Sequence, residues 1–298
     1  MVNILISTYN GEKYIKQQLD SILNQRNVEY KVYIRDDGSQ DRTVEVIRRY
    51  ISKYSLEDRI LLVEGENIGF CPSFFELLYM ASEGDYWAFC DQDDYWYPDK
   101  LVRAEEWLNA QNPDIPLLYH SGIALGDDSL SVKKKYENPF PDFDFQKSIT
   151  SNIFYGFACV VNRAMYDKLV QVNPARIKYH DWFMAMIVTA FGKWHFSGEI
   201  QAVHRIHDTN TSPNTFRQKI AQGIGLLKGD DFYNKNAREF MKLYGPELKE
   251  EDRKILGLFV DEHYDLKHAL KKCFYSKRWN YRVSTELIFR GLMLLGRM

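Results

Sequence analysis

The amino-acid sequence predicts an α/β fold, in which a mostly parallel sheet has helices on both faces and a helical extension follows at the C-terminus. Short apolar runs alternate with segments of helical spacing over residues 2–110, which predicts the sheet. Polar residues follow the ends of three of these runs, as they do at the ligand-binding edge of such sheets. Beyond Asn210 only helical spacing is seen, which predicts the extension.

The first part of the chain consists of four repeats of a strand followed by a helix. Buried strands are expected at residues 2–7, 30–34, 59–63 and 85–90. Helices are expected at residues 12–25, 43–54 and 74–81, and a fourth opens at Pro98. Repetition of this kind predicts parallel pairing of the strands.

The rest of the chain divides into a mixed part and a helical part. Strands are expected at residues 119–125, 156–162 and 199–204, with a helix at residues 181–191. Helices are expected at residues 216–227, 236–244, 250–272 and 284–295. We therefore expect an α/β domain over residues 1–212 and a helical C-terminal region over residues 213–298.

Composition and charge exclude several classes of protein. The formal net charge is −2, so we expect no nucleic-acid partner. Cys71, Cys90, Cys159 and Cys273 form no CxxC pair, which argues against zinc and indicates reduced thiols. The first residues do not read as a signal peptide, and the longest apolar run, residues 182–191, is about half of the ~20 residues that cross a bilayer. We expect a cytoplasmic protein that does not span a membrane.

Three polar clusters follow the ends of expected strands. They begin at Ser7, Asp36 and Asp91, after the first, second and fourth strands. Because the carboxyl ends of parallel strands lie at one edge of a sheet, we expect the three clusters to form a single acidic crevice.

The cluster after the fourth strand contains Asp91, Asp93 and Asp94. Like charges this close must share a cation or hold protons. Carboxylate oxygens suit Mg²⁺ or Mn²⁺, which in turn bind phosphates. The other interpretation is a solvated acidic turn, because two aspartates one residue apart are a weak motif by themselves.

The cluster after the second strand contains Asp36 and Asp37, followed by Gly38, which permits a tight turn. Ser39 or Asp41 could cap the next helix. Capping does not explain two adjacent carboxylates at a strand end. One of them could accept a hydrogen bond from the imide N–H of a pyrimidine base, and both interpretations stay open.

Taken together, these motifs resemble the family 2 glycosyltransferases, which have the Rossmann-like GT-A fold. The resemblance rests on Ser7-Thr8-Tyr9-Asn10, Asp36-Asp37-Gly38-Ser39 with Asp41, Asn67-Ile68-Gly69, and Asp91-Gln92-Asp93-Asp94 with the following Pro98-Asp99-Lys100-Leu101. These motifs occur in the family's order and spacing, and the resemblance covers residues 2–210. It implies an enzyme that moves a sugar from a nucleotide-sugar donor to an acceptor hydroxyl.

The resemblance implies a role for individual residues. Ser7 and Tyr9 would line the base and ribose pocket, Asp37 would accept from the base with Asp36 beside it, and Asp91 would lie near the ribose and the metal. Further residues would contact the metal, the phosphates or the acceptor. The metal ligands would be Asp93 and His207, and the acceptor or phosphate contacts would be Asp94, Trp96, His180, Trp182 and Arg205.

The resemblance also implies a general base, for which Asp181 is the best match. A hydroxyl becomes an effective nucleophile when its proton is removed as the new bond forms, and a carboxylate can take that proton. The transfer would occur in one step with inversion. The alternative is that Asp181 caps the helix that it opens, as aspartate often does.

The amino-acid sequences of the motifs around Tyr9, Asp93 and Asp181 resemble those of the bacterial rhamnosyltransferase branch of the family. That branch implies dTDP-rhamnose as donor and surface-polysaccharide synthesis, with Mn²⁺ or Mg²⁺ as cofactor. One alternative is a UDP-hexose or UDP-N-acetylhexosamine transferase of the same family. Another, of a different class, is a non-catalytic subunit that binds nucleotide-sugar or polysaccharide.

The C-terminal tail from Lys267 onward is basic and amphipathic, with Glu286 as its only acid. Such a helix suits an anionic membrane surface. We expect a peripheral contact with the inner face of the plasma membrane, which would fit the polyprenyl-linked glycan acceptors of the family. The alternatives are a helix packed on the catalytic domain and a contact between copies of the chain.

Overall fold

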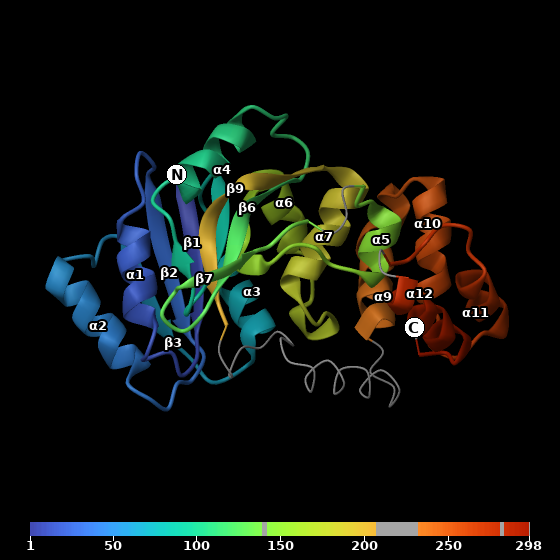
Figure 1. Ribbon diagram of the computed structural model, residues 1–298, viewed down its shortest axis with the longest axis horizontal. Coiled ribbons are helices and arrows are strands. Elements are labelled where there is room, and N and C mark those ends of the chain that lie inside the picture. The colour runs from blue at the N-terminus through green and yellow to red at the C-terminus, as the bar shows by residue number, and fades with distance from the viewer. Residues whose placement is uncertain (139–141, 207–231, 281–282, 298) are drawn as a thin grey trace. The chain divides into compact units, whose positions relative to one another are not determined.

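The computed structural model describes residues 1–138, 142–206, 232–280 and 283–297 (Figure 1). Its contacts divide the chain into two compact units, each made of separate stretches of sequence. The first unit contains Met1–Glu137, Phe154–Val170 and Gly192–His207, and the second contains Asn138–Ile153, Gln171–Phe191 and Asp208–Met298. The expected boundary at residue 212 falls outside the described residues and stays a prediction.

The first unit is built on one mixed sheet. Among the described residues this sheet has nine strands, in the order β3-β2-β1-β4-β8-β6-β9-β5, with β7 paired to β6. The strands are β1 Val2–Thr8, β2 Tyr30–Asp36, β3 Ile60–Glu64, β4 Tyr86–Asp91, β5 Tyr95–Trp96, β6 Leu117–Gly126, β7 Val132–Lys135, β8 Cys159–Asn162 and β9 Lys193–Arg205.

The expected parallel pairing is confirmed for the N-terminal half. β1 pairs in parallel with both β2 and β4, and β2 pairs in parallel with β3. β8 then runs antiparallel to both β4 and β6, and β9 returns to a parallel pairing with β6. The α/β fold class is therefore confirmed, with antiparallel strands added at one side of the sheet.

The strand β9 is much longer than the strand expected at residues 199–204. It begins at Lys193, and its register against β6 shifts on either side of Gly122. A Cβ atom on Gly122 would lie 2.0 Å from the carbonyl oxygen of Glu199, so only glycine allows the two strands this close. The shift is a bulge, and bulges redirect side chains locally.

Helices cover both faces of the sheet, as expected (Figure 1). α1 (Ile15–Leu23), α2 (Thr43–Tyr54) and α4 (Lys100–Asn109) share one core with alternate residues of the central strands, such as Ile4 and Ile34. On the other face, α3 (Phe70–Met80) packs Phe74 against Phe89 of β4, with ring centroids 5.7 Å apart. Alternation of this kind follows from the two-residue period of a strand. A further helix on this face is α6 (Arg163–Leu169), whose Tyr166 stacks on Trp87 at 4.2 Å.

The second unit consists of helices in its described residues. These are α5 Phe145–Thr150, α7 His180–Phe191, α9 Phe232–Tyr244, α10 Glu250–Leu256, α11 Leu266–Cys273 and α12 Val283–Leu294. Short 3₁₀ turns complete the elements of the two units: Gly156–Ala158, Pro174–Arg176, Gly245–Glu247 and Gly257–Phe259. The helix expected at residues 216–227 lies outside the described residues.

The prediction of a single helix over residues 250–272 is wrong. α10 ends at Leu256, and α11 begins only at Leu266. The Asp265 side chain accepts a hydrogen bond from the backbone N–H of His268 at 2.7 Å, which is an N-cap. A new helix therefore starts there. Within the described residues, no helix combines the length and the apolar character that crossing a bilayer requires.

Candidate functional site

The three polar clusters meet at one edge of the sheet, as expected. Ser7 of β1 lies beside Asp91 of β4 in the strand register, and Thr8 lies beside Asp36 of β2. All three strands run in parallel, so their carboxyl ends open on the same edge. The prediction of a single acidic edge is therefore confirmed for the first unit.

Side chains tie the loops at this edge to one another. The Gln92 side chain accepts from the backbone N–H of Tyr9 and donates to its carbonyl, both at 2.9 Å. The next residue, Asn10, has a left-handed φ of 48° and donates its N–H to Ser39 Oγ at 2.9 Å. Tyr9 itself is 46% exposed. The phenol ring is thus available to a ligand while its backbone is held on both sides.

Asp36 holds the turn that follows β2. Its carboxylate accepts from Thr8 Oγ1 at 2.9 Å, from the Ser39 N–H at 2.8 Å and from Ser39 Oγ at 2.6 Å. The turn needs Gly38, whose φ is +80°. Of the two residues that could cap the next helix, Ser39 donates its hydroxyl to Asp36, whereas Asp41 accepts from the Thr43 N–H at 2.9 Å.

Asp37 is also used inside the protein. Its two carboxylate oxygens accept from the N–H groups of Ile68 and Gly69, both at 2.9 Å, and Arg35 pairs with it at 2.5 Å. Only 2% of Asp37 is exposed. The visible role of this carboxylate is to fix the turn around residue 68, and its expected contact with a base stays a prediction.

The acidic cluster after β4 has the composition of a divalent-cation site. Asp91, Asp93 and Asp94 each offer a carboxylate oxygen, and these oxygens lie within 4.8 Å of one another. One buried oxygen, Oδ2 of Asp94, has no hydrogen-bond donor among the described residues. Oxygen ligands of this kind suit Mg²⁺ and Mn²⁺, so the residues present fit such an ion. His207, the other expected ligand, lies outside the described residues.

Asp94 is fully buried and is held from β9. Its Oδ1 accepts from the backbone N–H of Arg205 at 3.0 Å and lies 2.9 Å from Nδ1 of His204. Burial by itself would lower the pKa of His204, but the carboxylate of Asp94, together with the charges of Asp91 and Asp93, raises the pKa to about 9. His204 is therefore charged at neutral pH, and Asp94 is its buried counter-ion. A direct contact of Asp94 with acceptor or phosphate is not supported by this burial.

Arg205 has a different role from the one expected. Only 2% of it is exposed, and its guanidinium donates to the carbonyl of Asp93 and to Gln17 Oε1, both at 2.7 Å. It also donates to the carbonyl of Asp128. The expected phosphate contact is corrected on this ground: in the structure Arg205 ties the acidic loop to α1 and to the loop after β6.

Trp96 is likewise corrected, because its ring is fully buried in the core. The ammonium group of Lys100 lies 4.6 Å from the ring centroid and donates to Ser121 Oγ at 2.7 Å. Burial lowers the pKa of Lys100 to about 8. Trp96 therefore packs inside the protein beneath the loop after β4, and its ring offers no surface to a sugar.

The motif around Asp181 lies in the second unit, at the start of α7. Asp181 is half-buried, and its Oδ1 accepts from the Trp182 N–H at 2.7 Å. The indole N–H of Trp182 donates to the Ser148 carbonyl at 2.7 Å. Burial lowers the pKa of His180 to about 3, so this imidazole is neutral and supplies no charge to a phosphate. The expected roles of Asp181 and Trp182 stay predictions.

Three residues that organise this edge have no role in the sequence-based prediction. Gln92, His204 and Lys100 act through contacts with residues far along the chain, such as Tyr9 and Ser121. Gln92 and Lys100 stand inside the motifs quoted above, and His204 directly precedes Arg205, which was a usable signal for Gln92 and His204. Lys100 lies on a helix after a proline, where a lysine normally faces solvent, so nothing in the sequence indicates its burial.

Comparison with known proteins identifies relatives of the chain. The family described as "Glycosyl transferase family 2" matches residues 3–170. The dTDP-rhamnosyl transferase RfbG of Shigella flexneri is 28% identical over 238 residues, which cover 75% of this chain and 79% of that protein. An uncharacterised glycosyltransferase of Nostoc sp. is 25% identical over 295 residues, which cover 94% of this chain and 85% of that protein.

Solved structures show the same fold. Staphylococcus aureus TarS 1–349 in complex with UDP-GlcNAc has a TM-score of 0.57 at 16% identity, covering 99% of this chain and 91% of that one. The mannosyltransferase PcManGT from Pyrobaculum calidifontis, in complex with GDP-Man and Mn²⁺, has a TM-score of 0.56 at 15% identity, covering 99% and 85%. At these identities the likeness concerns the fold alone.

Proposed function

The chain belongs to glycosyl transferase family 2, and on that premise we propose that it is an inverting, divalent-metal-dependent rhamnosyltransferase. The donor is dTDP-rhamnose, and the acceptor is a hydroxyl of a polyprenyl-linked glycan in surface-polysaccharide synthesis. The observation that carries the metal-dependent part is the edge at which β1, β2 and β4 bring Ser7, Asp36 and Asp91 together beside the acidic cluster.

The donor end of the reaction is assigned to the first unit. Ser7 and the exposed Tyr9 are proposed to contact the nucleoside, with Asp36 and Asp37 fixing the turns around it. A divalent cation held by Asp91, Asp93 and His207 would supply positive charge beside the donor diphosphate. The buried His204–Asp94 pair and Arg205 hold this loop in place, so the carboxylates are oriented before any ligand arrives.

The acceptor end of the reaction is assigned to Asp181. The acceptor hydroxyl attacks the anomeric carbon as its proton passes to the Asp181 carboxylate, and the bond from that carbon to the diphosphate oxygen breaks. Attack opposite the leaving group inverts the anomeric configuration. Asp181 is half-buried in the first turn of α7, so its carboxylate lies near the positive end of the helix dipole.

The choice of rhamnose rests on the sequences of these motifs and on the relative named dTDP-rhamnosyl transferase. Thermal unfolding in the presence of dTDP, dTDP-rhamnose, UDP and UDP-hexoses, each with and without Mn²⁺, tests it. A ligand that binds only the folded state raises the melting temperature. We expect the largest metal-dependent rise with the dTDP compounds. A largest rise with UDP compounds would replace rhamnose by a hexose or N-acetylhexosamine.

Two variants locate the effect in the acidic cluster. Asp93→Asn should abolish the metal-dependent rise and lower transfer by at least about 100-fold. Asp99→Asn is the matched control, because Asp99 is an exposed carboxylate whose side chain caps no helix N–H. No rise with any nucleotide in the wild-type protein, or an equal rise in Asp93→Asn, would contradict the proposal.

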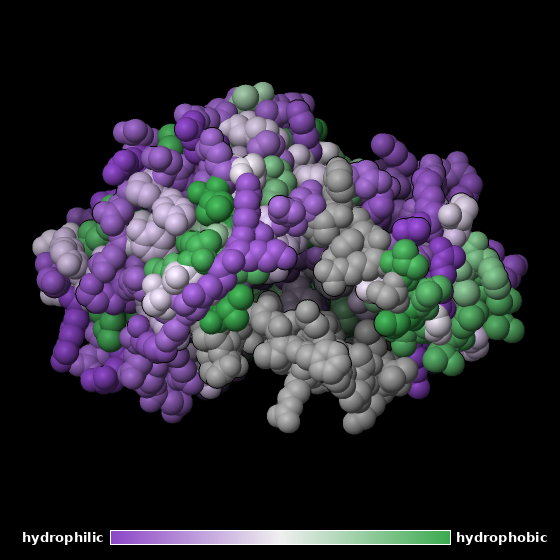
Figure 2. Space-filling model, in the orientation of Figure 1, coloured by the Kyte–Doolittle hydropathy of each residue, from purple (hydrophilic) through white to green (hydrophobic). Residues whose placement is uncertain are grey.

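The second unit carries an exposed apolar face, which we assign to an anionic membrane surface. This C-terminal apolar face consists of Leu266, Leu270, Phe274, Leu287, Ile288 and Leu295 (Figure 2). Phe274 is 77% exposed and Leu287 is 66% exposed, which is unusual for side chains of this size. The exposed Lys267 and Lys271 lie on the same helix, α11, and supply the complementary charge.

A further inference from the structure

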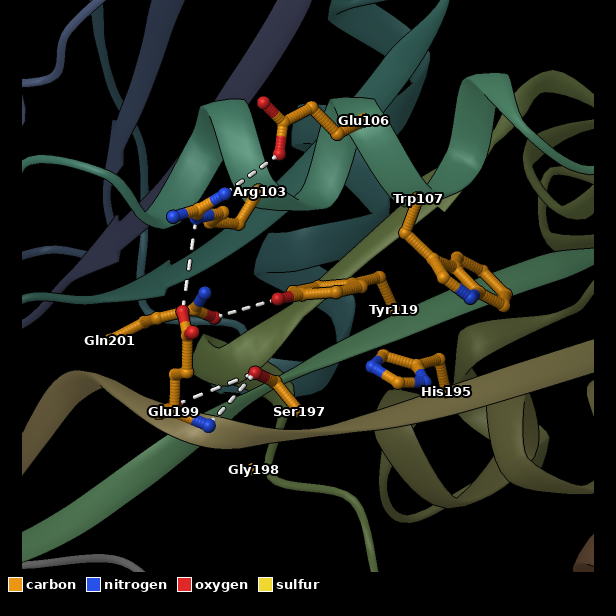
Figure 3. A pocket seen from close by; sticks show the side chains of 9 residues that line it. All are labelled: Arg103, Glu106, Trp107, Tyr119, His195, Ser197, Gly198, Glu199 and Gln201. Atoms are coloured by element: carbon orange, nitrogen blue, oxygen red, sulfur yellow. Dashed lines mark hydrogen bonds and ion pairs between the residues drawn. The ribbon is translucent and has the colours of Figure 1, made fainter.

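A pocket of about 450 Å³ opens in the first unit between α4, β6 and β9 (Figure 3). It is separate from the acidic cluster: its floor includes Gln201, whereas the residues that hold Asp94 lie further along β9, at His204 and Arg205. This volume lies within the ~300–1,000 Å³ of typical small-ligand sites. The bulge in β9 opposite Gly122 turns Ser197 and Glu199 toward the pocket.

One wall of the pocket is aromatic. The indole of Trp107 on α4 stacks on the imidazole of His195 on β9, with ring centroids 5.4 Å apart and an angle of 21° between the planes. Tyr119 of β6 lies 5.5 Å from the same imidazole. Burial lowers the pKa of His195, so the stack is uncharged at neutral pH. Trp107 and His195 are only half-buried, which leaves ring surface for a ligand.

The opposite rim of the pocket is polar, and its ion pairs are exposed enough for a ligand to replace them. Arg103 lies 3.2 Å from Glu106 and 3.7 Å from Glu199, and all three side chains are about half exposed or more. Exposed pairs of this kind are worth only about 0–1 kcal/mol, so a ligand can displace them at little cost. Two carboxylates and one guanidinium give the rim a net negative charge, which disfavours phosphates and other anions.

A buried amide in the floor lacks a partner. Gln201 is 4% exposed, and its Oε1 accepts from the Tyr119 hydroxyl at 2.9 Å. Its Nε2 has no hydrogen-bond acceptor among the described residues, although buried polar groups normally have one. The pocket therefore combines an unsatisfied donor, carboxylate acceptors and a guanidinium donor beside aromatic faces. Hydroxyl groups both donate and accept, and so match this set.

We propose that this pocket binds an uncharged saccharide segment of the acceptor glycan, and the acceptor part of this assignment rests on the proposed function. A sugar ring lies against Trp107 and His195, and its hydroxyls bond to Arg103, Glu199 and Gln201. Strand β9 joins the pocket to the acidic edge, since His204 follows Gln201 by roughly 10 Å at about 3.3 Å per residue. The pocket would thus hold a part of the glycan away from the reacting hydroxyl.

The test uses the full chain without metal or donor. The six tryptophan indole N–H signals are recorded by NMR, and the Trp107 signal is identified with Trp107→Phe. Maltotetraose, cellotetraose, chitotetraose and a rhamnose tetrasaccharide are titrated in turn. We expect at least one of them to shift the Trp107 signal. The paired variant Arg103→Ala with Glu199→Ala should weaken that binding about tenfold, because it removes hydrogen bonds to the hydroxyls.

Two controls separate this proposal from the proposed function. Asp93→Asn should leave saccharide binding unchanged, because it alters only the acidic cluster, and Glu45→Ala with Arg49→Ala removes an equivalent exposed pair on α2. Saccharide binding without any nucleotide binding would retain the pocket and reject the donor assignment. The pocket proposal is overturned if no tetrasaccharide shifts the Trp107 signal. It is also overturned if a uronic-acid oligosaccharide or dTDP binds there more tightly, or if the paired variant binds like wild type.

Discussion

At the scale of single residues, adjacent aspartates of the acidic cluster do different work. Asp93 is half-buried and carries the metal assignment, whereas Asp94 is fully buried and pairs with His204. A buried ion pair contributes little net stability, but removing one partner leaves the other charge uncompensated. The two positions should therefore respond differently to the same substitution.

Asp94→Asn should lower the free energy of unfolding by about 3 kcal/mol, because it leaves a buried His204 without its counter-ion. Urea unfolding at neutral pH measures the change. Asp99→Asn, on the exposed loop before α4, should change it by less than about 0.5 kcal/mol. Equal effects of the two substitutions would mean that the His204–Asp94 pair is not buried in solution.

Lys100 predicts a pH dependence of stability. Its pKa is about 8 in the folded protein because of burial, compared with an ordinary value of 10.5. Between these values the unfolded chain holds a proton that the folded chain has lost, so stability rises with pH there. Relative to Lys100→Met, the wild-type unfolding free energy should climb above pH ~8 by up to about 1.4 kcal/mol per pH unit. Parallel profiles for the two proteins would contradict the buried lysine.

At the scale of elements, the carboxyl-end loops behave as one assembly. Gln92 joins the loop after β4 to the loop after β1, and Asn10 joins that loop to the turn after β2. Arg205, at the end of β9, donates to the carbonyl of Asp93 and so joins β9 to the loop after β4. A nucleotide bound at this edge therefore meets loops that are already held, and less conformational entropy is lost on binding.

Gln92→Ala should weaken binding of the preferred nucleotide by about tenfold, because two hydrogen bonds to Tyr9 are lost. Gln92→Glu keeps an acceptor for the Tyr9 N–H but loses the donor to the Tyr9 carbonyl. Its nucleotide affinity should lie between those of the wild type and Gln92→Ala. Calorimetric titration of the folded variants measures both affinities. Wild-type affinity in Gln92→Ala would show that the two hydrogen bonds between Gln92 and Tyr9 do not order the site.

At the scale of the whole molecule, charge and apolar surface are unevenly distributed. The chain has a net charge of −2, yet its C-terminal residues are basic. Not all of these charges are free: Lys272 is buried over the Phe259 ring, and Arg290 pairs with Glu286 at 2.6 Å. Lys267, Lys271 and the C-terminal apolar face remain exposed, which is the combination that binds anionic membranes.

The wild-type chain should co-sediment with phosphatidylglycerol vesicles and much less with phosphatidylcholine vesicles, and added salt should weaken the binding. Phe274→Ser with Leu287→Ser should abolish it, because both side chains lie on the C-terminal apolar face. Leu61→Ser with Val63→Ser, which are exposed on β3, is the control and should bind like wild type. Self-association through this face, without vesicle binding, would assign it to a second copy of the chain.

The sequence by itself determined the α/β class, the parallel half of the sheet and the meeting of Ser7, Asp36 and Asp91 at one edge. These follow from local periodicity and from a general rule, because parallel strands place their carboxyl ends together. The motifs also determined the family. The extent of β9 was not predictable, since its bulge depends on pairing with a distant strand, β6. The break between α10 and α11 did leave a local signal, because Asp265 caps α11 through the N–H of His268, three residues later.

Only the tertiary structure decided which polar side chains face a ligand and which support the site from inside. Trp96, Arg205 and Asp94 read as contact residues, yet each is buried by an element from elsewhere in the chain, as Arg205 is by the carbonyls of Asp93 and Asp128. The same holds for the pocket between α4, β6 and β9, where Trp107, Tyr119 and Gln201 come from three separate segments. Burial and hydrogen-bond partners are properties of packing between distant segments, and residue type and local spacing do not encode them.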